Sequence, residues 1–388
     1  MRKTVLLIMM MASMAIACGQ SPAVPRTPTG KPEPSMEAKL AFNLRADIAE
    51  MLIVGFRGTT VDKNSTIVSD ITKYGVGGVI LFEYDAPTGT HHRNISSPKQ
   101  LKKLCQDLQS YAQGRLLIGI DQEGGKVSRL KAADGFPLVP TAQRMAELGI
   151  DSVVYYAEVT SKMLNEAGIN LNFAPCADVN VNPQCPVIGK MGRSFSSDPE
   201  LVKRYCRKWM EVQSNHNIVS CMKHFPGHGS AKGDTHQGLV DVSDTWKDAE
   251  LEPYRKLIAE GRVPMIMMAH VVNTHLDSLY PASLSKLCTQ QLLRKSLGFK
   301  GVIVTDDMAM GAIVKQYGAD EAIRLALEAG ADMLCLSNNG DRYDEKLVIH
   351  TIEIIESLVR KGQVSAERIH KSAERVRAMK QKYGVVMQ

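Results

Sequence analysis

The stretch Gly301-Val302-Ile303-Val304-Thr305-Asp306 sets the pattern of the chain, because it is a short apolar run, rich in β-branched residues, that ends in an acid. A strand that is buried on both faces of a parallel sheet has this composition. Seven more runs of similar length recur along the sequence. The eight predicted strands are Leu52–Phe56, Gly78–Phe82, Leu116–Asp121, Ile169–Pro175, Ile218–Phe225, Pro264–Val271, Gly301–Asp306 and Ala331–Ser337.

Amphipathic stretches separate these runs, and this alternation is typical of a parallel sheet covered by helices. Eight strands in one alternating series favour an α/β fold, a (β/α)8 TIM-type barrel, over an open doubly wound sheet. The helix-rich piece Asp344–Tyr383 is expected to close the ring. The other predicted helices are Pro98–Gln113, Asp151–Ala167, Asp198–Asn215, Lys247–Glu260 and Tyr317–Ala329.

The composition is that of a globular protein, since 44% of the 388 residues are apolar and 23% are charged. Wholesale disorder, a collagen-like repeat and a polytopic membrane protein are thereby excluded. The net charge of +6 comes from basic residues that are spread along the chain, so no nucleic-acid partner is expected. The sequence does not indicate an oligomeric state. No composition shift divides residues 37–388, which are expected to form one domain.

The first residues have the features of an export signal. Arg2 and Lys3 precede an apolar run from Val5 to Ala17, which is too short to cross a bilayer at about 20 residues per span. Cys18 follows at once, and this arrangement resembles a bacterial lipoprotein signal. An ordinary signal peptide that is cut elsewhere, or a plain N-terminal anchor, remains an alternative.

The resemblance implies that residues 1–17 are a signal peptide and that Cys18 carries the lipid. The protein would then be exported and anchored to a membrane of the bacterial cell envelope. Residues 18–36, with five prolines between Gly19 and Pro34, are expected to form an extended tether before the domain at 37–388.

The eight cysteines include no C-x-x-C pair, so neither a zinc motif nor a thiol-redox motif is indicated. Cys221 and Cys335 lie in apolar runs, where a small buried thiol is expected.

Polar residues gather where three predicted strands end, and in a barrel these ends form the working face. Asp306 ends the seventh strand and is expected to emerge at the barrel mouth, as a nucleophile or as a stabiliser of positive charge. The alternative is that this acid caps the next helix, a role that fits Asp307 better.

Asp234 and His236 lie two residues apart on a loop rich in small residues. A carboxylate against an imidazole would orient the ring and let it give and take a proton near neutrality. The alternative is a solvated Asp-x-His in a flexible loop.

His224, His228, Asp234 and His236 together also suggest a metal site, since imidazoles and a carboxylate suit zinc or iron. The Pro-Gly between the first two histidines breaks the helix that usually places such ligands on one face, so no metal is expected.

Five charged or polar side chains near the strand ends could donate or accept hydrogen bonds to a polyhydroxylated ligand. The alternatives are surface salt bridges for the arginines and a solvated amine for the lysine. These residues are Asp121, Arg129, Arg193, Lys223 and His224.

Together these segments resemble glycoside hydrolase family 3, and within it the β-N-acetylhexosaminidase branch. The resemblance covers roughly residues 45 to 385. One departure is that residues 188–193 carry two more residues than the family's Ile-Gly-x-Arg-Ser-Phe, which makes the placement of Arg193 the least secure. The matching segments are Gly75–Phe82, Asp121–Gly125, Arg193–Phe195, Lys223–Gly229, Asp234–His236, and Gly298–Gly301 leading into Thr305–Asp307.

The resemblance implies a retaining glycosidase that needs no cofactor, with Asp306 as nucleophile and His236, supported by Asp234, as the acid/base. The implied substrate is a terminal β-linked N-acetylglucosamine, from peptidoglycan fragments in recycling, chitin oligosaccharides or other glycans. The sugar-binding positions of the family match the five polar residues given above.

Three other functions stay open. A β-glucosidase of the same family generally carries its acid Glu on a second domain and lacks the Asp-x-His loop. A carbohydrate-binding lipoprotein without catalysis would have no use for the nucleophile and the acid/base together. A metal-dependent hydrolase would be inhibited by a chelator.

Overall fold

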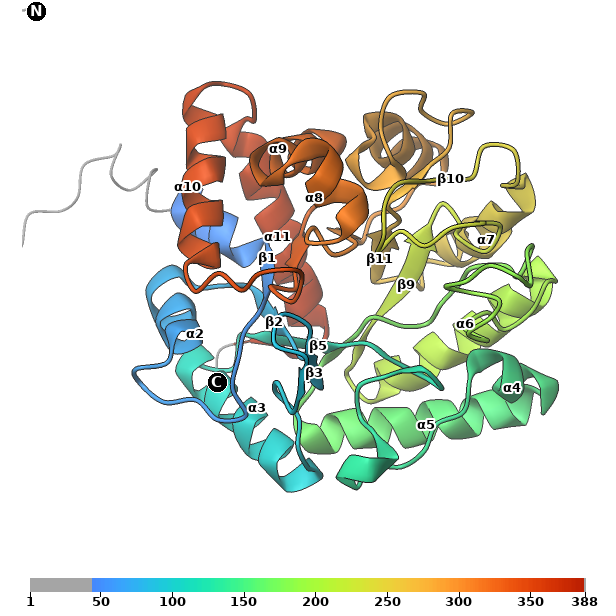
Figure 1. The fold of residues 1–388 in the computed structure, drawn as a ribbon, viewed down its shortest axis with the longest axis horizontal. Helices are drawn as coiled ribbons and strands as arrows, with labels where there is room; N and C mark the ends of the chain where they lie inside the picture. The colour runs from blue at the N-terminus through green and yellow to red at the C-terminus, as the bar shows by residue number, and fades with distance from the viewer. Residues whose placement is uncertain (1–43, 387–388) are drawn as a thin grey trace, which may run out of the picture.

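The computed structural model describes residues 44–386, which form a barrel of eight parallel strands ringed by helices (Figure 1). From the first to the seventh, each barrel strand pairs with the barrel strand that follows it, and the eighth pairs with the first. A single bridge between Val304 and Met333 joins the remaining two neighbours and nearly closes the ring. The strands are β1 (Leu52–Gly55), β2 (Gly78–Ile80), β5 (Leu117–Ile120), β8 (Leu171–Asn172), β9 (Val219–Phe225), β11 (Met265–Met268), β13 (Val302–Thr305) and β14 (Leu334–Leu336). The predicted barrel is confirmed.

Alternate residues of each strand face the barrel interior and the covering helices, which is why the runs are continuously apolar. Val302 and Val304 of β13 belong to the cluster inside the barrel, whereas Ile303 packs with the helices outside. Ile53 of β1 points inward in the same way, between Leu52 and Val54.

Helices follow most of the strands and cover the outside of the barrel (Figure 1). The cap of α3 explains where it begins, because the Ser97 hydroxyl accepts from the Gln100 N–H and Pro98 occupies the first turn. The helices outside the barrel include α2 (Thr66–Ser69), α3 (Pro98–Ala112), α4 (Ala142–Glu147), α5 (Ile150–Ala167), α6 (Pro199–Asn215), α7 (Glu252–Ala259), η5 (Leu287–Ser296), α8 (Gly311–Tyr317), α9 (Ala319–Ala329) and α10 (Leu347–Arg360).

The last helix does not take the place that the sequence suggested. Within the piece 344–383, α10 joins the ring, but α11 (Ala366–Lys382) packs on the barrel interior. Val376, Met379 and Tyr383 belong to the same buried cluster as the inward residues of the strands. The prediction that the whole piece closes the ring is therefore wrong for α11, which seals the end of the barrel opposite the carboxyl ends of the strands.

The seven cysteines between residues 44 and 386 are all free and buried, and the prediction of buried thiols for Cys221 and Cys335 is confirmed. In the same range, no helix combines the length and the apolar character needed to span a bilayer. The predicted signal peptide at 1–17, Cys18 and the tether at 18–36 lie outside the described residues.

Candidate active site

The carboxyl ends of the parallel strands bring together the polar residues that were noted in the sequence. Asp121 directly follows β5, Lys223 and His224 lie near the end of β9, and Asp306 directly follows β13. The Lys223 Nζ lies 2.7 Å from Asp121 Oδ1, although the two residues are 102 positions apart. Asp306 donates its backbone N–H to the Met268 carbonyl at the end of β11, 3.1 Å away.

Four of the five predicted sugar-binding residues form one network with an acid that sequence reasoning missed. Lys223 Nζ lies 2.7 Å from both Asp121 Oδ1 and Glu123 Oε1. Arg193 donates two hydrogen bonds to the Glu123 carboxylate, from Nε (2.8 Å) and from Nη2 (2.7 Å). Arg129 Nη2 donates to Asp121 Oδ2 at 3.3 Å. The Asp-x-Glu spacing after an apolar strand was the signal for Glu123.

The network is not a set of surface salt bridges, because the Lys223 and Arg193 side chains are only 3% and 10% exposed. Burial by itself raises the pKa of Glu123, but Arg193 and Lys223 outweigh it and hold this pKa at about 2. Burial likewise lowers the pKa of Lys223, yet Asp121 and Glu123 leave it above its ordinary value. All of these groups are therefore charged near neutrality, and each buried charge depends on its partners.

The loop before Arg193, which has two extra residues, is held by backbone hydrogen bonds. The Arg193 N–H donates to the Ile188 carbonyl at 3.1 Å, and the Gly192 carbonyl accepts from the Gln143 N–H at 3.0 Å. The turn thus aims the guanidinium at Glu123 and at His224, whose Nε2 lies 3.2 Å from Arg193 Nη2.

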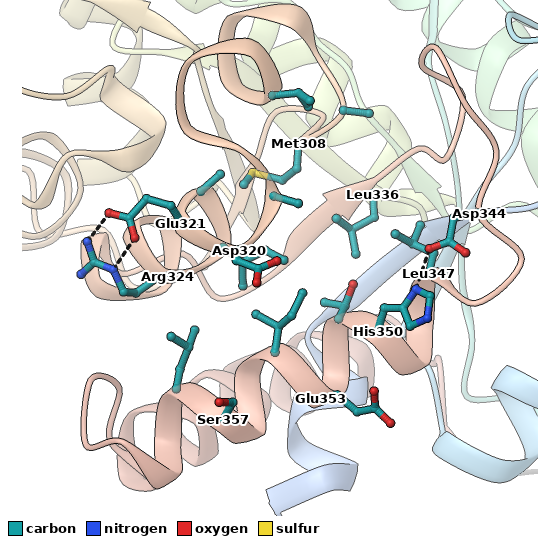
Figure 2. Close-up of a pocket in the computed structure, with 18 of the residues that line it drawn as sticks. Met308, Asp320, Glu321, Arg324, Leu336, Asp344, Leu347, His350, Glu353 and Ser357 are labelled. Carbon is teal, nitrogen blue, oxygen red and sulfur yellow. Dashed lines mark hydrogen bonds and ion pairs between the residues drawn. The ribbon is translucent and has the colours of Figure 1, made fainter.

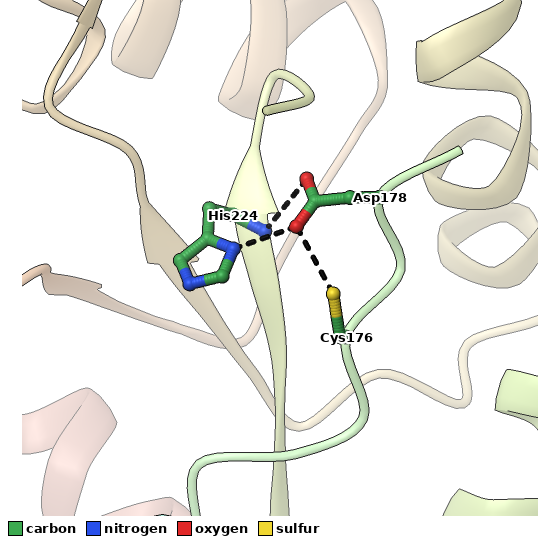
Figure 3. A group of neighbouring side chains, drawn as sticks. All are labelled: Cys176, Asp178 and His224. Atoms are coloured by element: carbon green, nitrogen blue, oxygen red, sulfur yellow. Dashed lines mark hydrogen bonds and ion pairs between the residues drawn. The ribbon is translucent and has the colours of Figure 1, made fainter. Parts of the chain in front are cut away.

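Asp178, also missed from the sequence, fixes the orientation of His224 (Figure 3). Asp178 is fully buried, and its Oδ2 accepts from His224 Nδ1 at 2.6 Å and from the Cys176 thiol at 3.1 Å. Its Oδ1 accepts from the backbone N–H groups of His224 (3.3 Å) and His228 (2.7 Å). With Nδ1 protonated, the Nε2 of His224 is free to face Arg193 and the barrel mouth.

Cys176, Asp178 and His224 are also the group within residues 44–386 whose atoms lie close enough to hold a metal. A hydrogen-bond network explains them better. Burial raises the pKa of the Cys176 thiol well above its ordinary value, so it stays protonated and donates to Asp178. Both oxygens of Asp178 are already occupied by donors.

The four residues of the alternative metal set are divided between two environments. His228 is buried and its Nε2 lies 3.3 Å from the Thr235 hydroxyl. His236 is 66% exposed and pairs with Asp234. In the described part of the chain they do not form a metal-binding group together with His224.

Asp306 is half-buried, and its Oδ1 accepts the Asp307 N–H at 2.8 Å. Burial raises the pKa of this carboxyl, but His270 and His224 outweigh that effect and lower it. Asp306 is therefore ionised near neutrality, as a nucleophilic carboxylate must be.

The neighbouring Asp307 does not cap the next helix, because the residue at that cap is Met310. Instead Asp307 Oδ1 accepts from the Ser337 N–H at 3.0 Å, and its Oδ2 from the Ser337 hydroxyl at 2.5 Å. The capping prediction is wrong, because the Asp307 carboxylate accepts both hydrogen bonds of Ser337. These bonds link the segment after β13 to the segment after β14.

His270, just past β11, was not noted in the sequence. It is fully buried, its Nε2 donates to the Asp307 carbonyl at 3.0 Å, and its Nδ1 lies 2.6 Å from the Ser283 hydroxyl. Burial lowers the pKa of His270, so the ring is neutral and Nδ1 accepts from Ser283. His270 thereby holds the turn that carries Asp306.

The structure pairs Asp234 with His236 on the loop after β9. Asp234 Oδ1 lies 2.7 Å from His236 Nδ1 and also accepts the His236 N–H at 2.9 Å. Thr235 between them is 2% exposed and is held by His228. The pair is thus solvent-accessible, but its backbone is anchored rather than free.

The start of α8 provides a seat for this loop. The Ala312 N–H donates to the Thr235 carbonyl at 3.3 Å, and Lys315 Nζ donates to the Gln237 carbonyl at 3.3 Å. Gly311 packs so closely that an added Cβ would lie 2.7 Å from the His236 carbonyl oxygen. Gly311 comes five residues after Asp306, so the segment that follows the strand-end carboxylate is also the seat of the His loop.

A groove of about 880 Å³ runs on the outer surface between α8, α9 and α10 (Figure 2). Met308, Leu336 and His350 are among the residues that line it. None of Asp306, Asp234 and His236 lines it, so the groove is not the place where these groups would act.

Comparison with known proteins agrees with this geometry. The family model described as the glycosyl hydrolase family 3 N terminal domain matches residues 43–379. The chain belongs to glycoside hydrolase family 3. The predictions of a glycoside hydrolase and of the family's barrel are therefore confirmed.

Several family 3 relatives share much of the chain. A beta-hexosaminidase from Neisseria gonorrhoeae is 34% identical over 281 residues, which are 70% of this chain and 73% of that protein. The structure of a glycoside hydrolase family 3 beta-N-acetylglucosaminidase from Paenibacillus is 35% identical with a TM-score of 0.78, over 88% of this chain and 63% of that one. A beta-N-acetylhexosaminidase from Beutenbergia cavernae is 26% identical with a TM-score of 0.77, over 87% and 98%. The chain thus spans less than two thirds of the length of the Paenibacillus enzyme.

Proposed function

We propose that this family 3 glycoside hydrolase is an exo-acting, retaining β-N-acetylhexosaminidase that removes terminal β-linked N-acetylglucosamine. Asp306 attacks the anomeric carbon and forms a covalent glycosyl-enzyme. His236, paired with Asp234, protonates the leaving oxygen and then deprotonates the water that releases the sugar. No cofactor takes part.

The observation that carries the proposal is that the Asp234–His236 loop is seated on the start of α8, the helix that follows Asp306 at the end of β13. The nucleophile must be an ionised carboxylate, and the pKa of Asp306 stays below its ordinary value although burial raises it. The acid/base needs a ring whose Nδ1 is held by a carboxylate, and Asp234 lies 2.7 Å from it. The Nε2 of His236 is then the atom that exchanges the proton.

The buried charge network supports a role in holding the sugar. Asp121, Arg129, Lys223 and Arg193 present charged donors and acceptors whose positions are fixed by their partners, and His224 adds a ring nitrogen beside Arg193. Rigid polar groups of this kind suit the hydroxyls of a pyranose, because little side-chain entropy is lost when the sugar binds.

The named relatives favour N-acetylhexosamine over glucose, since the Neisseria proteins are beta-hexosaminidases and the Paenibacillus structure is a beta-N-acetylglucosaminidase. A β-glucosidase of the same family is the second candidate. A binding protein without catalysis is less consistent with an ionised Asp306 beside an exposed, carboxylate-paired imidazole.

We also propose that the chain is an exported lipoprotein, with cleavage after residue 17 and a lipid on Cys18. The substrate would then be an envelope or extracellular glycan, such as a peptidoglycan fragment or a chitin oligosaccharide. In a detergent phase-partition experiment on protein expressed in a bacterium, the wild type should enter the detergent phase and Cys18→Ser the aqueous phase. Equal partition of both proteins would reject the anchor.

The proposed activity is tested by release of nitrophenol from the aryl β-N-acetylglucosaminide and from the β-glucoside, with and without EDTA. We expect turnover of the first substrate only, unaffected by EDTA and lost in Asp306→Asn. His236→Ala should lose most of its activity, since positioned proton transfer contributes about 10²–10⁴ in rate. Turnover of the glucoside would favour the glucosidase, and inhibition by EDTA would favour a metal hydrolase.

A further inference from the structure

A second pocket, of about 500 Å³, lies at the end of the barrel opposite the candidate active site. Phe299 and Gly330, which line it, precede β13 and β14, so the pocket is at the amino ends of the strands. The first turns of α11 and the end of η5 form its other walls. Its lining includes six basic residues, namely Arg294, Lys295, Lys300, Arg368, Lys371 and Arg375.

Asp332 is a buried carboxylate next to the residues that line this pocket, and both of its oxygens accept hydrogen bonds. Asp332 has no exposed surface, and its Oδ1 accepts from Arg375 Nη1 at 2.8 Å and from the Ser372 hydroxyl at 2.7 Å. Its Oδ2 accepts from Arg294 Nη2 and from the Ile303 N–H, the latter at 2.9 Å. Both oxygens of Asp332 therefore already accept hydrogen bonds from the protein itself.

The remaining cations have little compensation. Arg368 donates to the Ser372 hydroxyl at 2.8 Å and to the Ala331 carbonyl, but it contacts no carboxylate within residues 44–386. Burial lowers the pKa of Arg368 to about 10; Asp332 opposes this shift, whereas the neighbouring Arg375 and Arg294 add to it. Glu367, which pairs with Lys371 at 2.5 Å, is the one acid among the residues that line the pocket.

Lys295 and Lys300 are exposed and form no ion pair in the described part of the chain. Six cations thus face two carboxylates, one of them buried behind the wall, which leaves a net charge of +4 around a pocket of small-molecule size. Like charges held this close repel one another, and a bound anion would relieve the repulsion.

We propose that this pocket binds a phosphate group, either as a soluble phosphate or as the phosphodiester of an anionic lipid headgroup. Guanidinium groups match the geometry of phosphate oxygens, and several cations together favour a multiply charged oxyanion over a single carboxylate. Because the pocket lies at the amino ends of the strands, a bound phosphate would not block the candidate active site at their carboxyl ends. The proposal does not depend on which sugar the mouth accepts.

The first test is titration of inorganic phosphate into the full chain, by calorimetry, against chloride at matched ionic strength. Lys295→Gln combined with Lys300→Gln removes two exposed charges without touching the core, and should weaken phosphate binding by about fivefold or more. Arg368→Gln should weaken it further. The matched control is Lys99→Gln with Lys102→Gln, two exposed lysines of α3, which should leave the affinity unchanged.

Vesicles distinguish the two sources of phosphate. The full chain with Cys18→Ser, so that no lipid is attached, would be mixed with phosphatidylcholine vesicles with and without phosphatidylglycerol. Binding to the anionic vesicles that falls in the Lys295/Lys300 variant identifies a headgroup, and phosphate binding without vesicle binding identifies a soluble ligand. Absence of phosphate binding, or binding that the Lys295/Lys300 variant leaves intact, would overturn the proposal.

Discussion

Gly311 at the start of α8 lies against the carbonyl oxygen of His236 so closely that a single added carbon would approach it to 2.7 Å. This contact, together with the hydrogen bond from Ala312 N–H to the Thr235 carbonyl, sets where the Asp234–His236 pair sits relative to Asp306. The position of the proposed acid/base therefore depends on a helix that carries no catalytic group.

Gly311→Ala is expected to displace the His loop and weaken proton donation to the leaving group. The loss of kcat should be about tenfold for an alkyl β-N-acetylglucosaminide, whose leaving group needs the acid, and small for the dinitrophenyl glycoside, which does not. Steady-state rates across a series of leaving groups measure this difference.

Gly238→Ala is the matched control, because Gly238 lies in the same loop with no atom within 4 Å of an added Cβ. It should leave both rates near those of the wild type. If Gly311→Ala behaved like Gly238→Ala, the seat on α8 would have no part in positioning His236.

Glu123→Gln is expected to destabilise the fold strongly. The substitution leaves Arg193 and Lys223 buried without their shared carboxylate, and breaking such a pair costs about 3–5 kcal/mol. Urea unfolding measures the change in free energy. Glu147→Gln, in an exposed pair with Arg144, should cost no more than about 1 kcal/mol. Similar costs for the two variants would mean that the network adds little to stability.

Glu250 gives the protein a distinct dependence of stability on pH. This carboxyl is fully buried beneath the turn after β9, where it accepts from the Gly229 N–H at 3.1 Å, and burial raises its pKa to about 7. An unfolded Glu has a pKa of about 4.3, so the folded state binds the proton more tightly. The contribution to stability is complete below about pH 4.3 and is lost as the pH rises towards 7.

Glu250→Gln should remove this loss. Thermal unfolding at pH 5 and pH 8 is expected to show a larger fall in Tm for the wild type than for Glu250→Gln. The exposed Glu345→Gln should follow the wild type. Parallel falls in all three proteins would show that Glu250 does not titrate in this range.

The strands could be predicted from sequence because each is a continuous apolar run, a local property that the barrel preserves. The position of α11 at the end of the barrel could not be predicted. Its amphipathic pattern indicates that one face is buried, but not which surface that face packs against. Asp178 and His270 were missed for a related reason. Neither lies in a motif, and each acts through a partner far along the chain, 46 residues away for Asp178 with His224 and 37 for His270 with Asp307.

The central claim is that Asp306 forms a covalent bond to the sugar while His236 supplies and removes the proton. His236→Ala mixed with the dinitrophenyl β-N-acetylglucosaminide tests it most directly, because this leaving group departs without an acid and the water that follows lacks its base. Intact-protein mass spectrometry should find the enzyme heavier by one N-acetylglucosaminyl residue, and peptide mapping should place that residue on Asp306. Turnover without any adduct, with the α-anomer as first product, would contradict the account.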